Sequence, residues 1–371
     1  MLGIQGGHAL VDGEFTSKPV NIISDVIVDE ISNQTEIIDA RDCYVLPGIV
    51  DVHGDAFERS IQPRPNVNFP VALALKDVDR QLIANGITTA YHGLTVSWEP
   101  GLRSYDAAQA FRRQLKTLRA GFACDMHLNI RWETFAIGFV PHMIEWLEDD
   151  PRSIFSLNDH TTSYLSLPKG ASKISRMAGR TGLSEAECQT LLGKTWEHRH
   201  EVPAAIATVC AGANSAGCAI FAHDELTPDM RAEHRSLGVR VSEFPMTVET
   251  AKCAASLNEH VVLGAPNVVR GGSQNNAIDA REAIEDGHCS VLASDYYYPA
   301  PLAAVFKLAD EGVLPLEKAW NLISKNAAAA ANLSDRGEIR EGMRADIILV
   351  EKDTRTVRAV ITKGQVKYTY K

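Results

Sequence analysis

The feature that most constrains the fold of this chain is an alternation of strand-like and helical stretches through its middle. Apolar runs rich in β-branched residues, such as Ile49–Asp55, Ile87–Tyr91 and Ile154–Asn158, are separated by helix-like stretches such as Val71–Asn85. This alternation is typical of parallel sheets whose strands are joined by helices. About eight strand–helix units can be counted, and they predict an α/β fold closed as a (β/α)8 TIM barrel.

An open, doubly wound sheet is the alternative architecture. Its dinucleotide-binding form carries a G-x-G-x-x-G turn after a strand, and no such motif follows a strand in this sequence. We therefore prefer the closed barrel.

The two ends of the chain have a different sequence pattern from the middle. Short strand-like runs fill the first part of the chain and return in Ala345–Val350, Val357–Ile361 and Val366–Tyr370. Neither end is long enough to bury a core alone, so we expect both ends to pair in one small β domain. The predicted division is a β-sandwich part over residues 1–47, the barrel over 48–335 and a second sandwich part over 336–371.

Composition excludes several classes of function. The formal net charge of -10 disfavours a nucleic-acid or anionic-membrane surface, because both need a broad basic face. No apolar run approaches the roughly 20 residues that cross a bilayer, and the first residues do not resemble a secretory signal. We therefore expect a cytoplasmic protein. The seven cysteines never form C-x-x-C, so neither disulfides nor a cysteine zinc site is predicted.

Metal-ligand residue types stand where strands of the barrel are expected to end. In barrels the active-site residues come from the C-terminal ends of several strands. Five predicted strand ends supply six candidate metal ligands: His53, Asp55, Glu133, His160, His223 and Asp295. Three imidazoles and three carboxylates suit two divalent metal ions that share a bridging carboxylate. We expect zinc, with manganese, nickel and iron as alternatives.

Each of these positions also has a structural interpretation. A single histidine such as His223 after an apolar strand is often a core or surface residue, and Asp295 could cap a helix. Glu133 could pair with Arg131. These explanations are independent of one another, whereas a metal centre accounts for all six positions together, so we favour ligands.

The same segments carry a resemblance to a known family. The chain resembles the amidohydrolase superfamily in three features: an L-P-G-x-x-D run before His53, single histidines and a final aspartate at strand ends, and G-x-I-x-x-G-x-x-A-D-x-x-L from Gly337 to Leu349. Within it, the chain is similar to the PhnM family of the carbon–phosphorus lyase pathway of phosphonate metabolism. That similarity lies in the runs LPGIVDVHGDAFER, SEFPMTVETA, GAPNVVRGGS and LASDYYYP.

This resemblance implies hydrolysis of alpha-D-ribose 1-methylphosphonate 5-triphosphate by a metal-activated water, with release of diphosphate. In that family pattern, Glu133 takes the place of a carboxylated lysine. We expect Asp295 to accept the proton of the water, and Asp51 and Asp224 to support metal ligands from behind. The expected partners are a small phosphorylated substrate and proteins of the carbon–phosphorus lyase pathway, with a homodimer as the default assembly.

Loop residues would have to neutralise the charge of such a substrate. Two arginines follow the first metal motif, and a third precedes two glycines and a serine. Guanidinium groups make forked contacts to phosphate, and successive glycine amides can form an anion nest. The predicted substrate-binding set is Arg59, Arg64, Arg270, Gly271, Gly272 and Ser273. The alternative is that these arginines pair with surface acids.

Three segments depart from the family pattern. The family reads D-H-T-P-G-Q where this chain has D-H-T-T-S-Y over residues 159–164, and H-S-G-N where it has Gln274–Asn276. A third difference is Tyr91–Gly93, which includes His92. All three are expected to line the pocket mouth, so hydrolysis is better supported than the substrate. The alternatives are an amidase or cyclic amidohydrolase that cleaves a C–N bond, and a catalytically inactive barrel that serves as a scaffold or binding protein.

Overall fold

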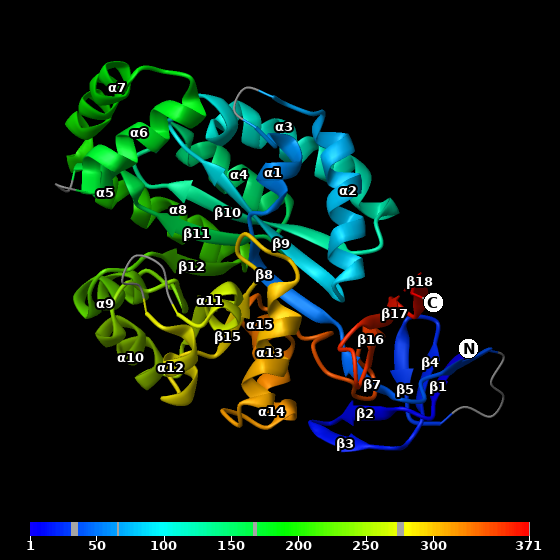
Figure 1. Cartoon of the computed structure of the whole chain (residues 1–371). Helices are drawn as coiled ribbons and strands as arrows, with labels where there is room; N and C mark the ends of the chain where they lie inside the picture. Colours follow the sequence, from blue (N-terminus) through cyan, green and yellow to red (C-terminus); the bar gives the residue numbers. More distant parts are fainter. Residues whose placement is uncertain (31–35, 65–66, 166–168, 273–277, 371) are drawn as a thin grey trace.

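The centre of the molecule is a barrel of eight parallel strands (Figure 1). The computed structural model describes residues 1–30, 36–64, 67–165, 169–272 and 278–370. Neighbouring strands pair in chain order, and a bridge between Gly54 and Asp295 joins the first strand to the segment after the last. The strands are β8 (Ile49–Gly54), β9 (Ile87–Val96), β10 (Asp125–Glu133), β11 (Ile154–Asn158), β12 (Ala219–His223), β13 (Val241–Glu243), β14 (His260–Gly264) and β15 (Val291–Ala293). The predicted TIM barrel is confirmed.

Helices cover the outside of this barrel (Figure 1). In α2, the buried residues Leu75, Val78 and Leu82 recur at helical spacing and form one apolar face. Burying one such side chain stabilises the fold by about 1.5 to 3 kcal/mol. The covering helices are α1 (Phe57–Ile61), α2 (Val71–Ala84), α3 (Tyr105–Leu118), α4 (Val140–Asp149), α8 (Val202–Ala216), α9 (Pro228–Ser236), α10 (Val248–Ser256), α11 (Ala265–Arg270), α12 (Ala280–Glu285), α13 (Ala300–Asp310), α14 (Leu316–Asn321) and α15 (Lys325–Ala330).

Three helices that precede the covering helix α8 are inserted between β11 and β12; they are called the excursion below. These are α5 (His160–Leu165), α6 (Lys169–Thr181) and α7 (Glu185–Glu197). The buried Glu99 carboxylate, just beyond β9, accepts hydrogen bonds from Arg180 Nε at 2.8 Å and from the Tyr164 hydroxyl at 2.9 Å. The excursion is therefore held against the C-terminal end of β9.

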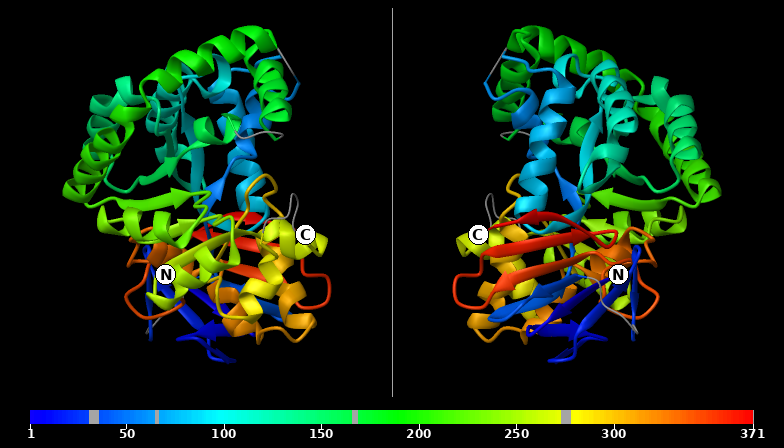
Figure 2. Two further views of the ribbon diagram at one scale, coloured as in Figure 1. Left: turned by 90° about the vertical axis from the view of Figure 1, so that its left-hand side faces the viewer. Right: turned by 90° about the vertical axis from the view of Figure 1, so that its right-hand side faces the viewer.

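Both ends of the chain build a β-sandwich beside the barrel (Figure 2). One sheet has the order β18-β17-β16-β7-β2-β3, in which β16 runs antiparallel to β7, and the other has the order β5-β4-β1-β6. Apolar residues of both sheets share one buried cluster. The strands are β1 (Leu2–Gln5), β2 (His8–Val11), β3 (Glu14–Thr16), β4 (Val20–Ile23), β5 (Val26–Val28), β6 (Glu36–Asp39), β7 (Cys43–Pro47), β16 (Ile347–Glu351), β17 (Val357–Thr362) and β18 (Gln365–Thr369). Pairing of the two ends is confirmed, and the domain bounds stay a prediction.

A buried ion network joins the sandwich to the barrel. The Asp125 carboxylate, at the start of β10, accepts hydrogen bonds from Arg336 Nη1 and Arg344 Nη1, both at 2.6 Å. The Arg344 guanidinium also pairs with Asp346. Because both arginines precede β16, the network fixes the C-terminal return of the chain to the N-terminal end of the barrel.

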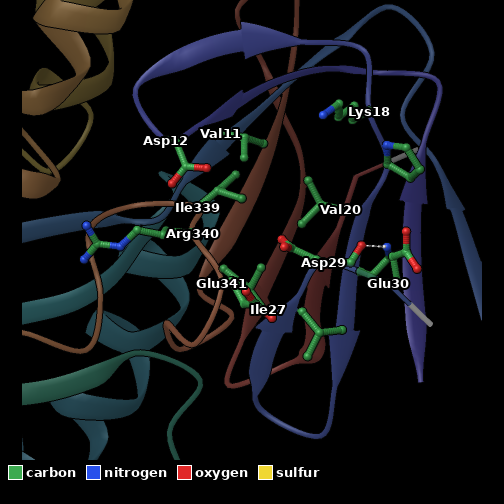
Figure 3. Close-up of a pocket in the computed structure, with 13 residues that line it drawn as sticks. Val11, Asp12, Lys18, Val20, Ile27, Asp29, Glu30, Ile339, Arg340 and Glu341 are labelled. Carbon is green, nitrogen blue, oxygen red and sulfur yellow. Dashed lines mark hydrogen bonds between the residues drawn. The ribbon is translucent and has the colours of Figure 1, made fainter.

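A cavity of about 700 Å³ lies in the sandwich (Figure 3). Its wall includes Asp12, Lys18, Asp29 and Arg340, and no residue of the barrel strands lines it. It is therefore remote from the predicted metal ligands. Among the described residues, no helix combines the length and apolar character required to cross a bilayer.

Candidate functional site

Imidazoles and carboxylates gather at the C-terminal ends of the barrel strands. Among the described residues, three groups offer ligand atoms within 4.8 Å of one another: His53 with Asp55 and Asp295, His160 with His223 and Asp224, and His53 with His223 and Glu243. Five of the six predicted ligands are thus brought together. Their roles as metal ligands stay a prediction.

Glu243, at the end of β13, holds two of the imidazoles in place. Its buried carboxylate accepts hydrogen bonds from His53 Nδ1 at 2.8 Å and from His223 Nδ1 at 2.9 Å. Burial opposes its negative charge, but the two imidazoles hold the pKa of Glu243 well below its ordinary value. Since each ring donates through Nδ1, the Nε2 lone pair of each ring is left to face the site.

Sequence reasoning missed Glu243. It is the last residue of β13 (Val241–Glu243), one of the barrel strands. Its position at a strand end was the signal that could have identified it.

Asp51 supports the far side of the site. Its buried carboxylate accepts hydrogen bonds from the Ser294 backbone N–H at 2.9 Å and from the Ser294 hydroxyl at 2.5 Å. The next residue, Asp295, donates its backbone N–H to the His53 carbonyl at 2.9 Å. Asp51 therefore fixes the turn that presents the Asp295 carboxylate beside His53, and its role as a support for metal ligands stays a prediction.

Asp295 is strained and only weakly acidic. Its φ of 54° lies in the left-handed region, which costs energy for a residue with a side chain and is often found at functional sites. Burial, together with the nearby Asp55 carboxylate, raises the pKa of Asp295 to about 6.

Asp224, which follows β12, also has a left-handed backbone conformation, with a φ of 58°. It was predicted to support ligands from behind, yet its carboxylate lies in a ligand group with His160 and His223.

Glu133 differs from the other predicted ligands. Its carboxylate accepts hydrogen bonds from the backbone N–H groups of His160 and Thr161 and from the Thr161 hydroxyl, and therefore caps α5. Burial, with the charge of Asp159 adding to it, raises the pKa of Glu133 to about 8. Its Oε2 also lies 3.7 Å from His160 Nδ1, and the ligand role of Glu133 stays a prediction.

Arg131 also faces the site, from two residues earlier on β10. Its Nη2 lies 2.8 Å from His223 Nε2, and its guanidinium is buried. From the sequence we considered Arg131 only as a partner of Glu133, whereas in the structure its guanidinium contacts His223.

Two of the predicted substrate arginines lie against Tyr296, the residue after Asp295. The Arg59 guanidinium carbon is 5.8 Å from the centre of the Tyr296 ring, and Arg270 Nη1 donates a hydrogen bond to the Tyr296 hydroxyl at 3.2 Å. Both are exposed, so they can meet an anionic ligand that approaches Asp295. Arg64 is also exposed, and its backbone bridges to Val67.

The predicted glycine nest is not supported. The backbone N–H groups of Gly271 and Gly272 both donate to the Asn267 carbonyl at 3.1 Å, because these glycines end α11. Amides used in this way are not free to bind an anion. Ser273 and the segment Gln274–Asn276 lie outside the described residues.

The other two segments that depart from the family pattern belong to regular elements: residues 160–164 lie in α5, and Tyr91–Gly93 lie in β9. His92 is 1% exposed, and its ring packs against Phe57 and Phe111 under α1 and α3. Burial lowers the pKa of His92 to about 3. Tyr164 bonds to Glu99 and anchors α5. The expectation that His92 lines the mouth was therefore wrong, because it points away from the barrel interior.

Comparisons with known proteins agree with this arrangement. Residues 197–371 match the model of the amidohydrolase family. The chain is 30% identical over 332 residues to alpha-D-ribose 1-methylphosphonate 5-triphosphate diphosphatase of Escherichia coli (strain K12), and the match covers 86% of each chain.

Solved structures with the same fold include an amidohydrolase from an environmental sample of the Sargasso Sea, with a TM-score of 0.68 and 14% identity over 99% of this chain and 93% of that one. A second is molinate hydrolase, with a TM-score of 0.65 and 13% identity over 98% of this chain and 94% of that one. By its sequence similarity, its barrel and its strand-end residues, the chain belongs to the amidohydrolase family of hydrolases, whose members generally use divalent metal ions.

Proposed function

We propose that the protein hydrolyses a phosphoric anhydride: the triphosphate of alpha-D-ribose 1-methylphosphonate 5-triphosphate, or of a related phosphorylated compound, with release of diphosphate. The observation that carries this proposal is the similarity to the diphosphatase of Escherichia coli, which is 30% identical and extends over 86% of both chains. The site's own residues supply three further arguments.

The first argument is that the group formed by His53, Asp55 and Asp295 fits a divalent metal ion. Its two carboxylates and the free Nε2 of His53 are ligand types of zinc and related metals, and Glu243 fixes the His53 tautomer. A metal bound there would polarise a phosphoryl oxygen and lower the pKa of water. We expect zinc, as before, with manganese, nickel or iron as alternatives.

The second argument is that Asp295 is suited to act as the general base. A carboxylate with a pKa of about 6 can take a proton from an attacking water near neutral pH and release it afterwards. The backbone hydrogen bonds between Asp295 and the segment His53–Asp55 keep it at the metal group. Asp51 holds the adjacent Ser294 and so limits the movement of Asp295.

The third argument concerns substrate charge. Arg59 and Arg270 approach Tyr296 from different helices, α1 and α11, directly beside Asp295. Two guanidinium groups on one side of the general base would neutralise the phosphates next to the cleaved bond. An uncharged amide substrate would have no use for them.

The test is a substrate panel with the purified, metal-loaded protein. The panel contains the ribose methylphosphonate triphosphate, a nucleoside triphosphate and a cyclic amide, and phosphorus NMR follows the phosphorylated products. We expect diphosphate and a 5-phosphate ester from the first compound. Turnover of the cyclic amide together with inert triphosphates would instead identify a C–N bond hydrolase.

A further inference from the structure

The candidate metal site contains a buried cation of its own. Arg131 projects from β10, is 5% exposed, and places Nη2 at 2.8 Å from His223 Nε2. Its Nε has no hydrogen-bond partner among the described residues. A buried guanidinium with an unused donor, aimed into a cluster of metal-type ligands, calls for a functional explanation.

The hydrogen-bond pattern defines what Arg131 does to His223. Because His223 Nδ1 donates to Glu243, its Nε2 carries the lone pair, and the permanently charged guanidinium must be the donor to it. That lone pair is the one that His223 would offer to a metal held together with His160 and Asp224. Arg131 and a metal ion cannot use it at the same time.

The charge of Arg131 acts on the whole group. His160 and Asp224 lie in the same ligand group as His223, whose Nε2 is 2.8 Å from Arg131 Nη2. A second divalent cation placed between these residues would therefore lie close to a buried positive charge, with the Asp224 carboxylate as the counter-charge in the group. The charge of Arg131 lies near His53 too, but among the described residues Arg131 makes no hydrogen bond to His53, Asp55 or Asp295, so their ligand atoms stay available to a metal.

Gly93 on the neighbouring strand β9 gives Arg131 its space. A Cβ atom at Gly93 would lie 3.3 Å from Arg131 Cδ and 3.4 Å from His53 Nε2, closer than side chains usually pack. The absence of a side chain at this position allows the guanidinium stem and the imidazole to lie next to each other.

We propose that the Arg131 guanidinium takes the place of a second metal ion at His223, so that the protein binds one divalent metal tightly, at His53, Asp55 and Asp295. This inference deepens the proposed function and rests on its metal group. It replaces the two-metal centre expected from the sequence with one metal and one guanidinium. In catalysis the guanidinium would be the second positive charge available to a phosphoryl oxygen.

The test counts metal ions in wild-type protein and in Arg131→Met. Each protein is stripped with a chelator, reloaded with manganese, dialysed, and measured by elemental analysis and electron paramagnetic resonance. We expect one metal and an uncoupled manganese spectrum in the wild type. In Arg131→Met we expect a second ion, bound on the order of tenfold more tightly than in the wild type, and a spin-coupled pair.

Further variants locate the second ion. Arg131→Lys keeps the charge and should remain at one metal. Adding His223→Asn to Arg131→Met should return the count to one, whereas His53→Asn should remove the first ion.

A wild-type protein that holds two tightly bound, coupled ions would overturn the proposal, and this measurement needs no variant to fold. An Arg131→Met protein that folds, by circular dichroism, and still binds only one ion would overturn it as well. Metal counts do not depend on the substrate. A protein with one metal that cleaves no phosphoric anhydride would refute the proposed function alone.

Discussion

At the scale of single residues, Glu243 determines which nitrogen two imidazoles present to the site. In Glu243→Gln, the side-chain amide nitrogen would face an imidazole Nδ1 that now donates to a carboxylate oxygen. One ring would have to change tautomer or rotate away. We expect metal affinity to fall by about 10- to 100-fold, as for other residues that orient a metal ligand.

The measurement is competition for manganese with a chelator of known affinity. Glu99→Gln is the matched control, because Glu99 is also buried but bonds to Arg180 and Tyr164 instead of to the histidines. Unchanged affinity in Glu243→Gln would show that the carboxylate is not needed to orient His53 and His223.

Asp295 carries the second prediction at this scale. Asp295→Asn keeps an oxygen that can contact a metal and the backbone bonds to the His53 strand, but it removes the base. We expect turnover to fall by at least about 10²- to 10⁴-fold while the melting temperature and most of the metal binding remain. Near-normal turnover in this variant would rule out Asp295 as the proton acceptor.

At the scale of elements, the alternating pattern predicted every strand of the barrel, and the errors lie at strand ends. Strand β9 extends to Val96, beyond the predicted Ile87–Tyr91, because it pairs along its length with β10 despite Gly93. Glu243 at the end of β13 was missed for the same reason: pairing partners set the end of a strand, and they are far apart in the sequence.

The same limit explains which site residues could be predicted. His53, His223 and Asp295 follow apolar strands directly, so residue type and position identify them. The roles of Arg131 and Glu133 depend on which groups each side chain contacts on other elements of the barrel. The sequence contains no periodic signal for such contacts.

The short helix α5 offers a third prediction. The Thr161 hydroxyl donates to Glu133 at 2.7 Å and accepts from Trp98 Nε1 at 2.9 Å, and it is fully buried. Thr161→Val keeps the shape, but it removes one hydrogen bond to Glu133 and leaves the Nε1–H of the partly buried Trp98 without its acceptor. We expect a loss of about 1 to 3 kcal/mol in the free energy of unfolding.

Urea denaturation followed by circular dichroism measures this loss. The matched control is Thr162→Val at the next position, where the hydroxyl is exposed and bonds to Asp159. That variant should change stability by no more than about 0.5 kcal/mol. Equal effects of the two substitutions would contradict a stabilising role for the buried Thr161 hydroxyl.

At the scale of the whole molecule, Asp125 joins the C-terminal return of the chain to the barrel. Burial opposes the charge of this carboxylate, but His127, Arg344 and Arg336 hold the pKa of Asp125 well below its usual range. In Asp125→Asn, Arg336 and Arg344 would keep their buried charges with one counter-ion fewer. We expect a loss of about 3 kcal/mol in the free energy of unfolding at neutral pH.

This loss should depend on pH in a defined direction. Because folding depresses the pKa of Asp125, its contribution is complete above the unfolded value of about 4 and declines as the pH falls further. The stability difference between wild type and Asp125→Asn should therefore shrink between neutral pH and about pH 3. Urea denaturation at a series of pH values measures it. Asp150→Asn, which loses a more exposed pair with Arg119, should cost no more than about 1 kcal/mol. A difference that stays constant down to acid pH would mean that charge on Asp125 does not hold the C-terminal return of the chain to the barrel.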